Sequence, residues 1–204
     1  MGGDGVDAGE SFGGYLDESI NIQENTNRIT SLINRLLALS ETSSRSKIER
    51  NDTVSILQLC QHVISASGVT DNSTHTFSFE APGISDKETI QTSEQYTVQA
   101  ICHLLDNAIK FTPAGGSIRM LCEADDHLVT ISIEDTGCGV PKEKANDIFA
   151  EFVQLDEFKT GVGIGLTLSR NIARRLGGDL VLDTSYTNGA RFVLTLKRSN
   201  ARKE

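Results

Sequence analysis

Two glycine-bearing segments, residues 135–140 and 161–166, limit the folds that this chain can adopt. The first follows residues 128–134, whose alternating apolar side chains predict a β-strand. The second precedes a helical pattern at residues 166–176, but residues 151–159 in front of it have no strand pattern. A Rossmann fold needs a strand directly before its glycines, and a Walker A loop ends in Gly-Lys-Ser/Thr. The sequence therefore argues against both of these nucleotide-binding designs.

The rest of the periodicity predicts a mixture of helices and strands. Helices are expected at residues 54–66, 93–111, 141–149 and 166–176. Strands are expected at residues 46–53, 74–80, 87–92, 117–123, 128–134, 179–184 and 190–196, and two of them, 117–123 and 128–134, form a hairpin. We therefore expect an α+β fold, a two-layer sandwich in which helices cover one face of a mixed β-sheet.

An N-terminal helical arm is expected at residues 13–45, after a disordered tail at residues 1–12 that is rich in Gly, Asp and Glu. The apolar residues of the arm recur every three or four positions and form one stripe, made of Ile22, Ile29, Leu32, Leu36 and Leu39. Because such a helix needs a partner, the stripe permits a homodimer. Packing of the arm on its own domain is the alternative.

Composition excludes several classes of function. The formal charge of −9 and the pI of about 4.9 make nucleic acid an unexpected partner, because phosphate backbones require a basic face. No apolar run approaches the roughly 20 residues of a membrane-spanning helix, and the N-terminus lacks the apolar region of a secretion signal. The four cysteines form no CxxC pattern, which favours reduced thiols in the cytoplasm.

Asn107 and Lys110 lie three residues apart, so the predicted helix places them on one face. The amide oxygen of Asn107 suits Mg²⁺, which prefers hard oxygen ligands, and Lys110 can contact a phosphate as a point charge. Taken alone, an exposed Asn and a solvated Lys would be the better explanation. The glycine segments downstream favour a nucleotide site instead.

Asp135 follows a predicted strand, where its carboxylate can accept a hydrogen bond from an exocyclic amine such as adenine N6. Gly137 and Gly139 allow the backbone to turn sharply and approach a flat ring. An ordinary strand-ending turn is the alternative. In the second segment, small residues ahead of a helix expose backbone N–H groups to an anion. This predicts phosphate contacts for Gly161, Gly163 and Gly165.

The residues between the two glycine segments suggest a lid. Phe149 and Phe152 can anchor a mobile segment by burying their rings at its base, although core packing explains them equally well. Lys159 is a candidate to close over the phosphates, with a solvated Lys as the alternative. Cys138 is expected only to fill space in the first segment, because no activating partner is visible.

In this order and spacing, the segments resemble the catalytic and ATP-binding domain of sensor histidine kinases. That domain belongs to a superfamily shared with gyrase-type topoisomerases, mismatch-repair ATPases and a large class of chaperones. The resemblance covers about residues 46–197, and we assign residues 46–200 to the domain. The matching segments are the N box at 107–113, the first glycine box at 135–140, the F box at 148–152, the second glycine box at 161–166 and the terminal box at 189–192.

Two further segments match. Residues 25–40 resemble the second helix of the dimerisation and phosphotransfer hairpin of these kinases, so the arm is interpreted as part of that hairpin. Residues 152–156 resemble kinases of the Bacteroidetes type.

The resemblance implies that ATP and Mg²⁺ bind between the Asn107 helix and the glycine loops. Asp135 would select adenine, Asn107 would hold the metal and Lys110 would contact phosphate, while Asn107 and His103 would be the catalytic residues. The remaining implied nucleotide contacts are Gly137, Gly139, Phe149, Phe152, Lys159, Gly161, Gly163, Gly165 and Leu166. The γ-phosphoryl group would pass in line to a histidine, by positioning and charge neutralisation.

The chain departs from the family pattern in three ways. None of the four histidines lies in a His-Glu/Asp-x-Arg-Thr-Pro motif, so transfer within this chain is not expected. His103 occupies an N-box position that usually holds Asn or Glu, and Ala190 replaces the usual Ser or Thr of the terminal box. Expected partners are therefore a hairpin that carries the acceptor histidine and the receiver domain of a response regulator.

Two alternatives remain open. His103 and the missing acceptor favour a degenerate kinase, a non-catalytic module that binds nucleotide or a partner. A serine-directed kinase of the anti-sigma type is disfavoured by the hairpin-like helix. The resemblance also implies that a full-length protein is anchored in the inner membrane, with this part in the cytoplasm.

Overall fold

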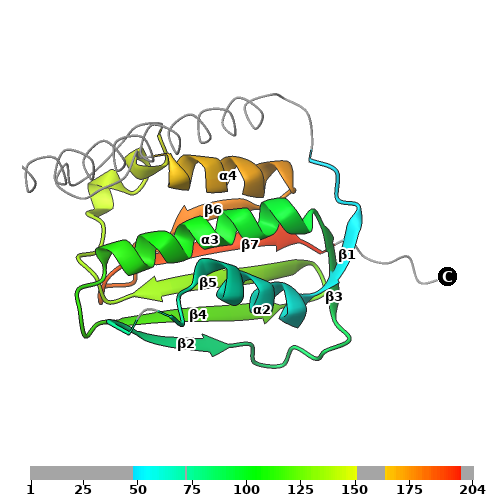
Figure 1. The fold of residues 1–204 in the computed structure, drawn as a ribbon. Helices are drawn as coiled ribbons and strands as arrows, with labels where there is room; N and C mark the ends of the chain where they lie inside the picture. Colours follow the sequence, from blue (N-terminus) through cyan, green and yellow to red (C-terminus); the bar gives the residue numbers. More distant parts are fainter. Residues whose placement is uncertain (1–47, 72, 151–163, 199–204) are drawn as a thin grey trace, which may run out of the picture. The chain divides into compact units, whose positions relative to one another are not determined.

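The computed structural model describes residues 48–71, 73–150 and 164–198, which all belong to one compact unit, Thr42–Glu204 (Figure 1). The predicted tail and arm, and the segment 151–163, lie outside the described residues. The helices are α2 (Ile56–Ser67), α3 (Glu94–Phe111) and α4 (Gly165–Arg175). The strands are β1 (Asp52–Ser55), β2 (Thr76–Glu80), β3 (Thr89–Thr92), β4 (Ser117–Ala124), β5 (Leu128–Asp135), β6 (Asp179–Leu182) and β7 (Arg191–Lys197).

Five strands form the main sheet in the order β2-β4-β5-β7-β6. β2 pairs with β4 in parallel and every other pair in this sheet is antiparallel, so the predicted mixed sheet is confirmed. The predicted hairpin of β4 and β5 is also confirmed. β1 and β3 form a separate two-stranded antiparallel sheet.

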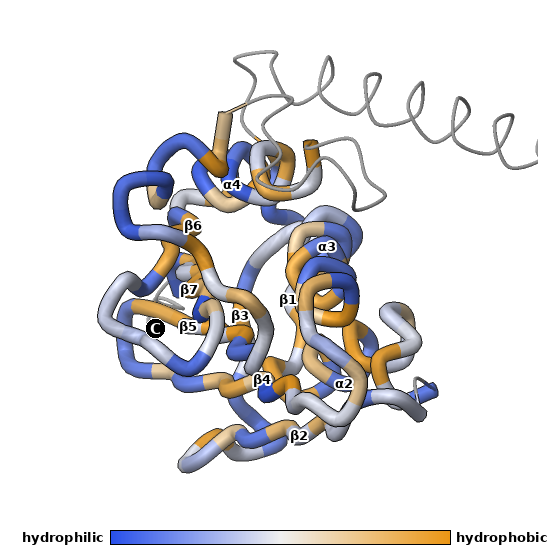
Figure 2. Tube along the Cα trace, turned by 90° about the vertical axis from the view of Figure 1, so that its left-hand side faces the viewer, coloured by the Kyte–Doolittle hydropathy of each residue, from blue (hydrophilic) through white to orange (hydrophobic). Residues whose placement is uncertain are grey.

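The three helices cover one face of the main sheet, which confirms the two-layer sandwich (Figure 1). α3 contacts both α2 and α4, and the core lies between the helices and the sheet. Figure 2 shows hydrophobic residues interleaved with hydrophilic ones along helices and strands, as expected for elements that are buried on one side. The largest fully buried side chains include Ile101, Leu104, Leu105, Ile118, Met120, Ile131, Ile133 and Leu168.

The helix boundaries follow from local chemistry. The side chain of Asp52 in β1 accepts a hydrogen bond from the backbone N–H of Glu94 at 2.8 Å. It therefore provides an acceptor for one of the N–H groups in the first turn of α3, which have no partner within the helix. The same helix ends before Pro113, with Thr112 donating its N–H to Ala108. α2 ends at Gly68, whose φ of 63° is the left-handed conformation that glycine adopts most easily.

The helix predicted at residues 141–149 is wrong. Two short 3₁₀ turns replace it, Lys142–Lys144 and Asp147–Phe149, closed by bonds between residues three apart. Only Ile148 and Phe149 are buried there, so the segment lacks the apolar stripe that holds an α-helix on a core. No helix in the described residues is long and apolar enough to cross a membrane.

Candidate functional site

Asp135 is the last residue of β5, and only 4% of its surface is exposed. Its Oδ1 accepts two backbone hydrogen bonds, from the N–H of Gly137 at 2.8 Å and from the N–H of Ala190 at 3.2 Å. Across the described ranges no protein group is bonded to the second oxygen, Oδ2. The carboxylate is therefore held by one oxygen, and the other can accept a hydrogen bond from a ligand.

Burial raises the pKa of Asp135 above its ordinary value, although the hydrogen bonds from Gly137 and Ala190 act in the opposite direction. A charged acceptor in a site with little water makes a strong hydrogen bond to a neutral donor such as an amine. This environment suits the recognition of a purine amine.

The first glycine loop, which is the first glycine box at residues 135–140, lies between the end of α3 and the loop that joins β6 to β7. A Cβ atom on Gly137 would lie 2.5 Å from the carbonyl oxygen of Phe111, and one on Gly139 would lie 2.9 Å from that of Gly189. Gly139 also has a φ of 68°. Side chains at these two positions would push the loop off its neighbours.

Gly189 and Ala190, at the end of the β6–β7 loop, contact Asp135 from the other side. A Cβ atom on Gly189 would overlap the carbonyl oxygen of Asp135. Ala190 is 6% exposed, and its carbonyl oxygen accepts the N–H of Asp135 at 2.9 Å. The sequence placed these residues in the terminal box, but it did not predict their contact with Asp135. No local signal in the sequence indicates this contact, because it depends on the pairing of β5 with β7.

α3 carries two of the predicted site residues, Asn107 and Lys110, near the first glycine loop. Asn107 and Lys110 are both half-buried in its C-terminal turns, and the Lys110 ammonium group lies 4.9 Å from the ring centre of Phe111. Since the carbonyl oxygen of Phe111 also lies against Gly137, the helix end and the first glycine loop are adjacent.

His103 lies one turn earlier on α3 and contacts the start of α4. Its Nδ1 is 3.5 Å from the hydroxyl of Ser169, which donates a hydrogen bond to the carbonyl oxygen of Ala100 at 3.0 Å. A Cβ atom on Gly165, the first residue of α4, would lie 3.8 Å from the Cβ atom of His103. The structure therefore brings these two predicted residues together.

Phe149 is 8% exposed and packs edge-to-face on Phe192 of β7, with ring centres 6.5 Å apart. The guanidinium group of Arg170 lies 4.4 Å from the centre of the same ring, and Thr167 donates its hydroxyl to the Phe149 carbonyl. The ring is thus fixed just before residue 151. Leu166 is half-buried in α4, whereas Phe152, Lys159, Gly161 and Gly163 lie outside the described residues.

Residues 92–200 match the family described as histidine kinase-, DNA gyrase B- and HSP90-like ATPase. The match contains α3, Asp135 and the β6–β7 loop, and it covers more than half of the 204 residues. The chain belongs to this ATPase family.

Curated relatives in this family are named as sensory kinases. Adaptive-response sensory kinase SasA of Synechococcus sp. (strain JA-3-3Ab) is 31% identical over 90% of this chain and 51% of its own length. Sensor histidine kinase WalK of Bacillus subtilis (strain 168) is 25% identical over 85% of this chain and 29% of its own length. The chain spans about half, or less, of these relatives.

Solved structures of histidine kinases share the fold. Full-length ShkA in complex with AMPPNP has a TM-score of 0.74 and 24% identity, covering 90% of this chain and 39% of that one. Histidine kinase ThkA in complex with response regulator TrrA has a TM-score of 0.73 and 21% identity, covering 95% of this chain and 53% of that one. At these identities the likeness concerns the fold.

Proposed function

We propose that this chain is the ATP-binding catalytic part of a sensor histidine kinase in two-component signal transduction. The observation that carries the proposal is the buried carboxylate of Asp135, which is held by two backbone N–H groups through Oδ1 and keeps Oδ2 for a ligand. Adenine N6 supplies the matching donor. Membership of the ATPase family and the kinase names of the relatives support the same conclusion.

Asn107 and Lys110 would act on the phosphates. Among the described residues, no group of three or more His, Cys, Asp or Glu side chains could hold a metal ion. Mg²⁺ nevertheless fits, because it binds through few protein oxygens, several waters and the nucleotide phosphates themselves. The amide oxygen of Asn107 would be one ligand, and the bound ion would neutralise phosphate charge. Lys110 would add a positive charge from the same helix.

His103 and Gly165 join the phosphate side to α4. The N-terminus of α4 presents backbone N–H groups, which favour an anion. In the reaction, the bond between the γ-phosphorus and the bridging oxygen breaks, and ADP leaves with the electron pair. An imidazole nitrogen of the acceptor forms the new bond and releases its proton to solvent.

The acceptor histidine would come from a dimerisation hairpin, because none of the four histidines here lies in the expected motif. A response regulator receiver domain would take the phosphoryl group next. Dimerisation through the arm, anchoring of a full-length protein in the inner membrane and a cytoplasmic place for this part belong to the same proposal. The Bacteroidetes interpretation stays a prediction, since SasA and WalK come from Synechococcus and Bacillus and do not support it.

A transfer assay tests the proposal directly. The chain is mixed with a separately produced hairpin that carries the acceptor histidine, together with Mg²⁺ and γ-labelled ATP. Label on the hairpin, lost when the acceptor histidine is replaced by Gln, is the expected result. Tight ATP binding without transfer would instead favour the degenerate kinase, for which the departure at His103 is the specific observation.

A further inference from the structure

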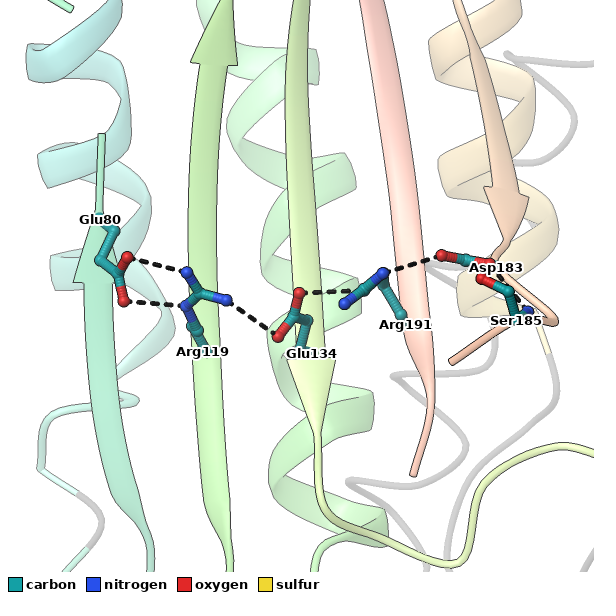
Figure 3. Close-up of polar contacts among 6 residues, drawn as sticks. All are labelled: Glu80, Arg119, Glu134, Asp183, Ser185 and Arg191. Carbon is teal, nitrogen blue, oxygen red and sulfur yellow. Dashed lines mark hydrogen bonds and ion pairs between the residues drawn. The ribbon is translucent and has the colours of Figure 1, made fainter. Parts of the chain in front are cut away.

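A row of alternating charges crosses the main sheet on the face opposite the helices (Figure 3). It starts at Glu80 of β2, which binds Arg119 of β4 through two bonds of 2.8 and 2.9 Å. Arg119 lies 3.3 Å from Glu134 of β5, and Glu134 lies 2.9 Å from Arg191 of β7. The row ends at Asp183, just after β6, which accepts a bond from Arg191 at 2.9 Å. We refer to these five residues as the charged row.

Arg191 contacts three groups: the carboxylates of Glu134 and Asp183 and the ring of Tyr186. Its Nε pairs with Oε1 of Glu134 at an angle outside hydrogen-bond geometry, and its Nη1 donates to Asp183. The guanidinium carbon also lies 4.5 Å from the ring centre of Tyr186. Asp183 in turn accepts the N–H and hydroxyl of Ser185 at 2.9 and 2.6 Å. Arg191 therefore binds β5 on one side and the β6–β7 loop on the other.

The position of Arg191 in the sheet connects it to the pocket. Glu134 and Arg191 are register partners, and their chain neighbours are Asp135 and Ala190. Those neighbours exchange two bonds, from Asp135 N–H to the Ala190 carbonyl and from Ala190 N–H to Oδ1. One face of this strand pair thus carries the ion pair, while the adjacent residues carry the pocket carboxylate and its donor.

The same loop supplies the pocket wall. It begins at Asp183, which Arg191 binds, and its Gly189 presses its backbone on the carbonyl group of Asp135. Tyr186 lies between these two positions and stacks on Arg191. If the contacts of Arg191 with the loop changed, Gly189 and Ala190 would move. The hydrogen bond from the Ala190 N–H that orients Oδ1 of Asp135 would then change as well.

We propose that Arg191 is a positioning residue for nucleotide selection: by clamping the β6–β7 loop to β5, it orients the carboxylate of Asp135 toward the adenine amine. This inference rests on the proposed function. Burial supports it, because the Glu134 side chain is only 9% exposed and requires a paired cation. Arginine also suits the position better than lysine, since a planar fork can bind two carboxylates and stack on a ring.

The experiment compares Arg191→Gln with Arg119→Gln. Both substitutions remove one cation of the charged row and one partner of Glu134, but Arg119 joins β4 to Glu80 on β2, at the far side of the sheet from the β6–β7 loop. For each variant, the dissociation constants of ATP and GTP are measured by calorimetry, and the unfolding midpoint is measured by circular dichroism. Arg191→Lys tests whether charge alone is sufficient.

We expect Arg191→Gln to weaken ATP binding by about tenfold and to narrow the preference for ATP over GTP. Arg119→Gln should leave the dissociation constants of ATP and GTP within about twofold of wild type, although it lowers the unfolding midpoint as much as Arg191→Gln does. Arg191→Lys should restore little of the lost ATP affinity. Equal losses of affinity in the two Gln variants, or none in either, would overturn the inference. If Arg191→Gln does not fold, Asp183→Asn decides by the same two readouts, because it breaks only the loop side of the clamp.

Measurements on the wild-type protein distinguish a failure of the proposed function from a failure of the role of Arg191. Failure of wild type to bind ATP would overturn the proposed function. ATP binding by wild type, with unchanged affinity and selectivity in Arg191→Gln, would overturn only the role of Arg191.

Discussion

The carboxylate oxygen Oδ1 of Asp135 and the backbone N–H of Ala190 are joined by a hydrogen bond of 3.2 Å across 55 positions of the chain. The bond fixes Oδ1 as the carboxylate oxygen that faces the backbone and leaves Oδ2 without a bond to the described residues. It also makes the pocket depend on a residue whose side chain is only a methyl group, because the backbone supplies the donor.

Replacing Asp135 by Asn should weaken ATP binding by about 10- to 100-fold, the range for loss of a hydrogen bond to a charged group. The Asn oxygen must still accept from Gly137 and Ala190, so its amide nitrogen takes the place of Oδ2. That nitrogen is a donor and faces the donor of adenine. Isothermal calorimetry measures the change. Glu123→Gln, on the exposed part of β4, is the matched control and should bind ATP like wild type.

The same substitution should change how stability depends on pH. Because the fold raises the pKa of Asp135, the folded state retains a proton that the unfolded state has already released. Its contribution is therefore complete below the ordinary value of 3.8 and is lost as pH rises through the folded-state pKa. The unfolding free energy of wild type relative to Asp135→Asn should fall as pH rises from about 3 to 7. Denaturant titrations at several pH values check this, and a difference that rises with pH would contradict it.

Gly189→Ala should lower the unfolding free energy by about 1–3 kcal/mol, because the new methyl group would overlap the carbonyl oxygen of Asp135 and backbone atoms must move. Gly165→Ala is the matched comparison. Its methyl group would meet only ordinary contact, 3.8 Å from the Cβ atom of His103, at the start of a helix. Thermal unfolding should show a lower midpoint for the first variant and an equal or higher one for the second. Equal midpoints in the two variants would show that the pocket wall can relax.

Cys138 should be the first of the four cysteines to react with iodoacetamide at a pH of about 8. It is exposed in the first glycine loop, whereas Cys60 and Cys122 are fully buried. Burial, aided by the charge of Asp106, raises the pKa of Cys102 to about 11, so little of its reactive thiolate exists at this pH. Peptide mapping by mass spectrometry identifies the modified residue, and bound ATP should slow the reaction. Modification of Cys102 at the same rate would contradict this order.

Local periodicity was sufficient to predict most elements of the fold. α3 and the β4–β5 hairpin follow directly from the spacing of apolar residues, and Pro113 marks the end of α3 in the sequence. The helix predicted at residues 141–149 does not form because only Ile148 and Phe149 are buried there, which leaves no apolar stripe to hold an α-helix on the core.

The site was less predictable because it depends on strand order. The sequence pointed to Asp135 and the glycines that follow it, but no local pattern showed that β5 pairs with β7 as well as with β4. Without that pairing, Ala190 was only a departure from the family pattern, and Arg191 had no role. The complete charged row was not predicted for the same reason, since Glu134 and Arg191 meet only through that pairing.

The pairing of β5 with β7 also bears on how the protein is made. During synthesis, Asp135 leaves the ribosome well before Ala190, and chains grow at about 5–20 residues per second. Until Ala190 has emerged, the carboxylate lacks its second backbone donor and the strand lacks its partner. ATP in the cell therefore cannot stabilise a nascent chain that stops short of this strand, since a ligand stabilises only the state that binds it. The nucleotide becomes a folding aid only for chains in which β7 has already been made.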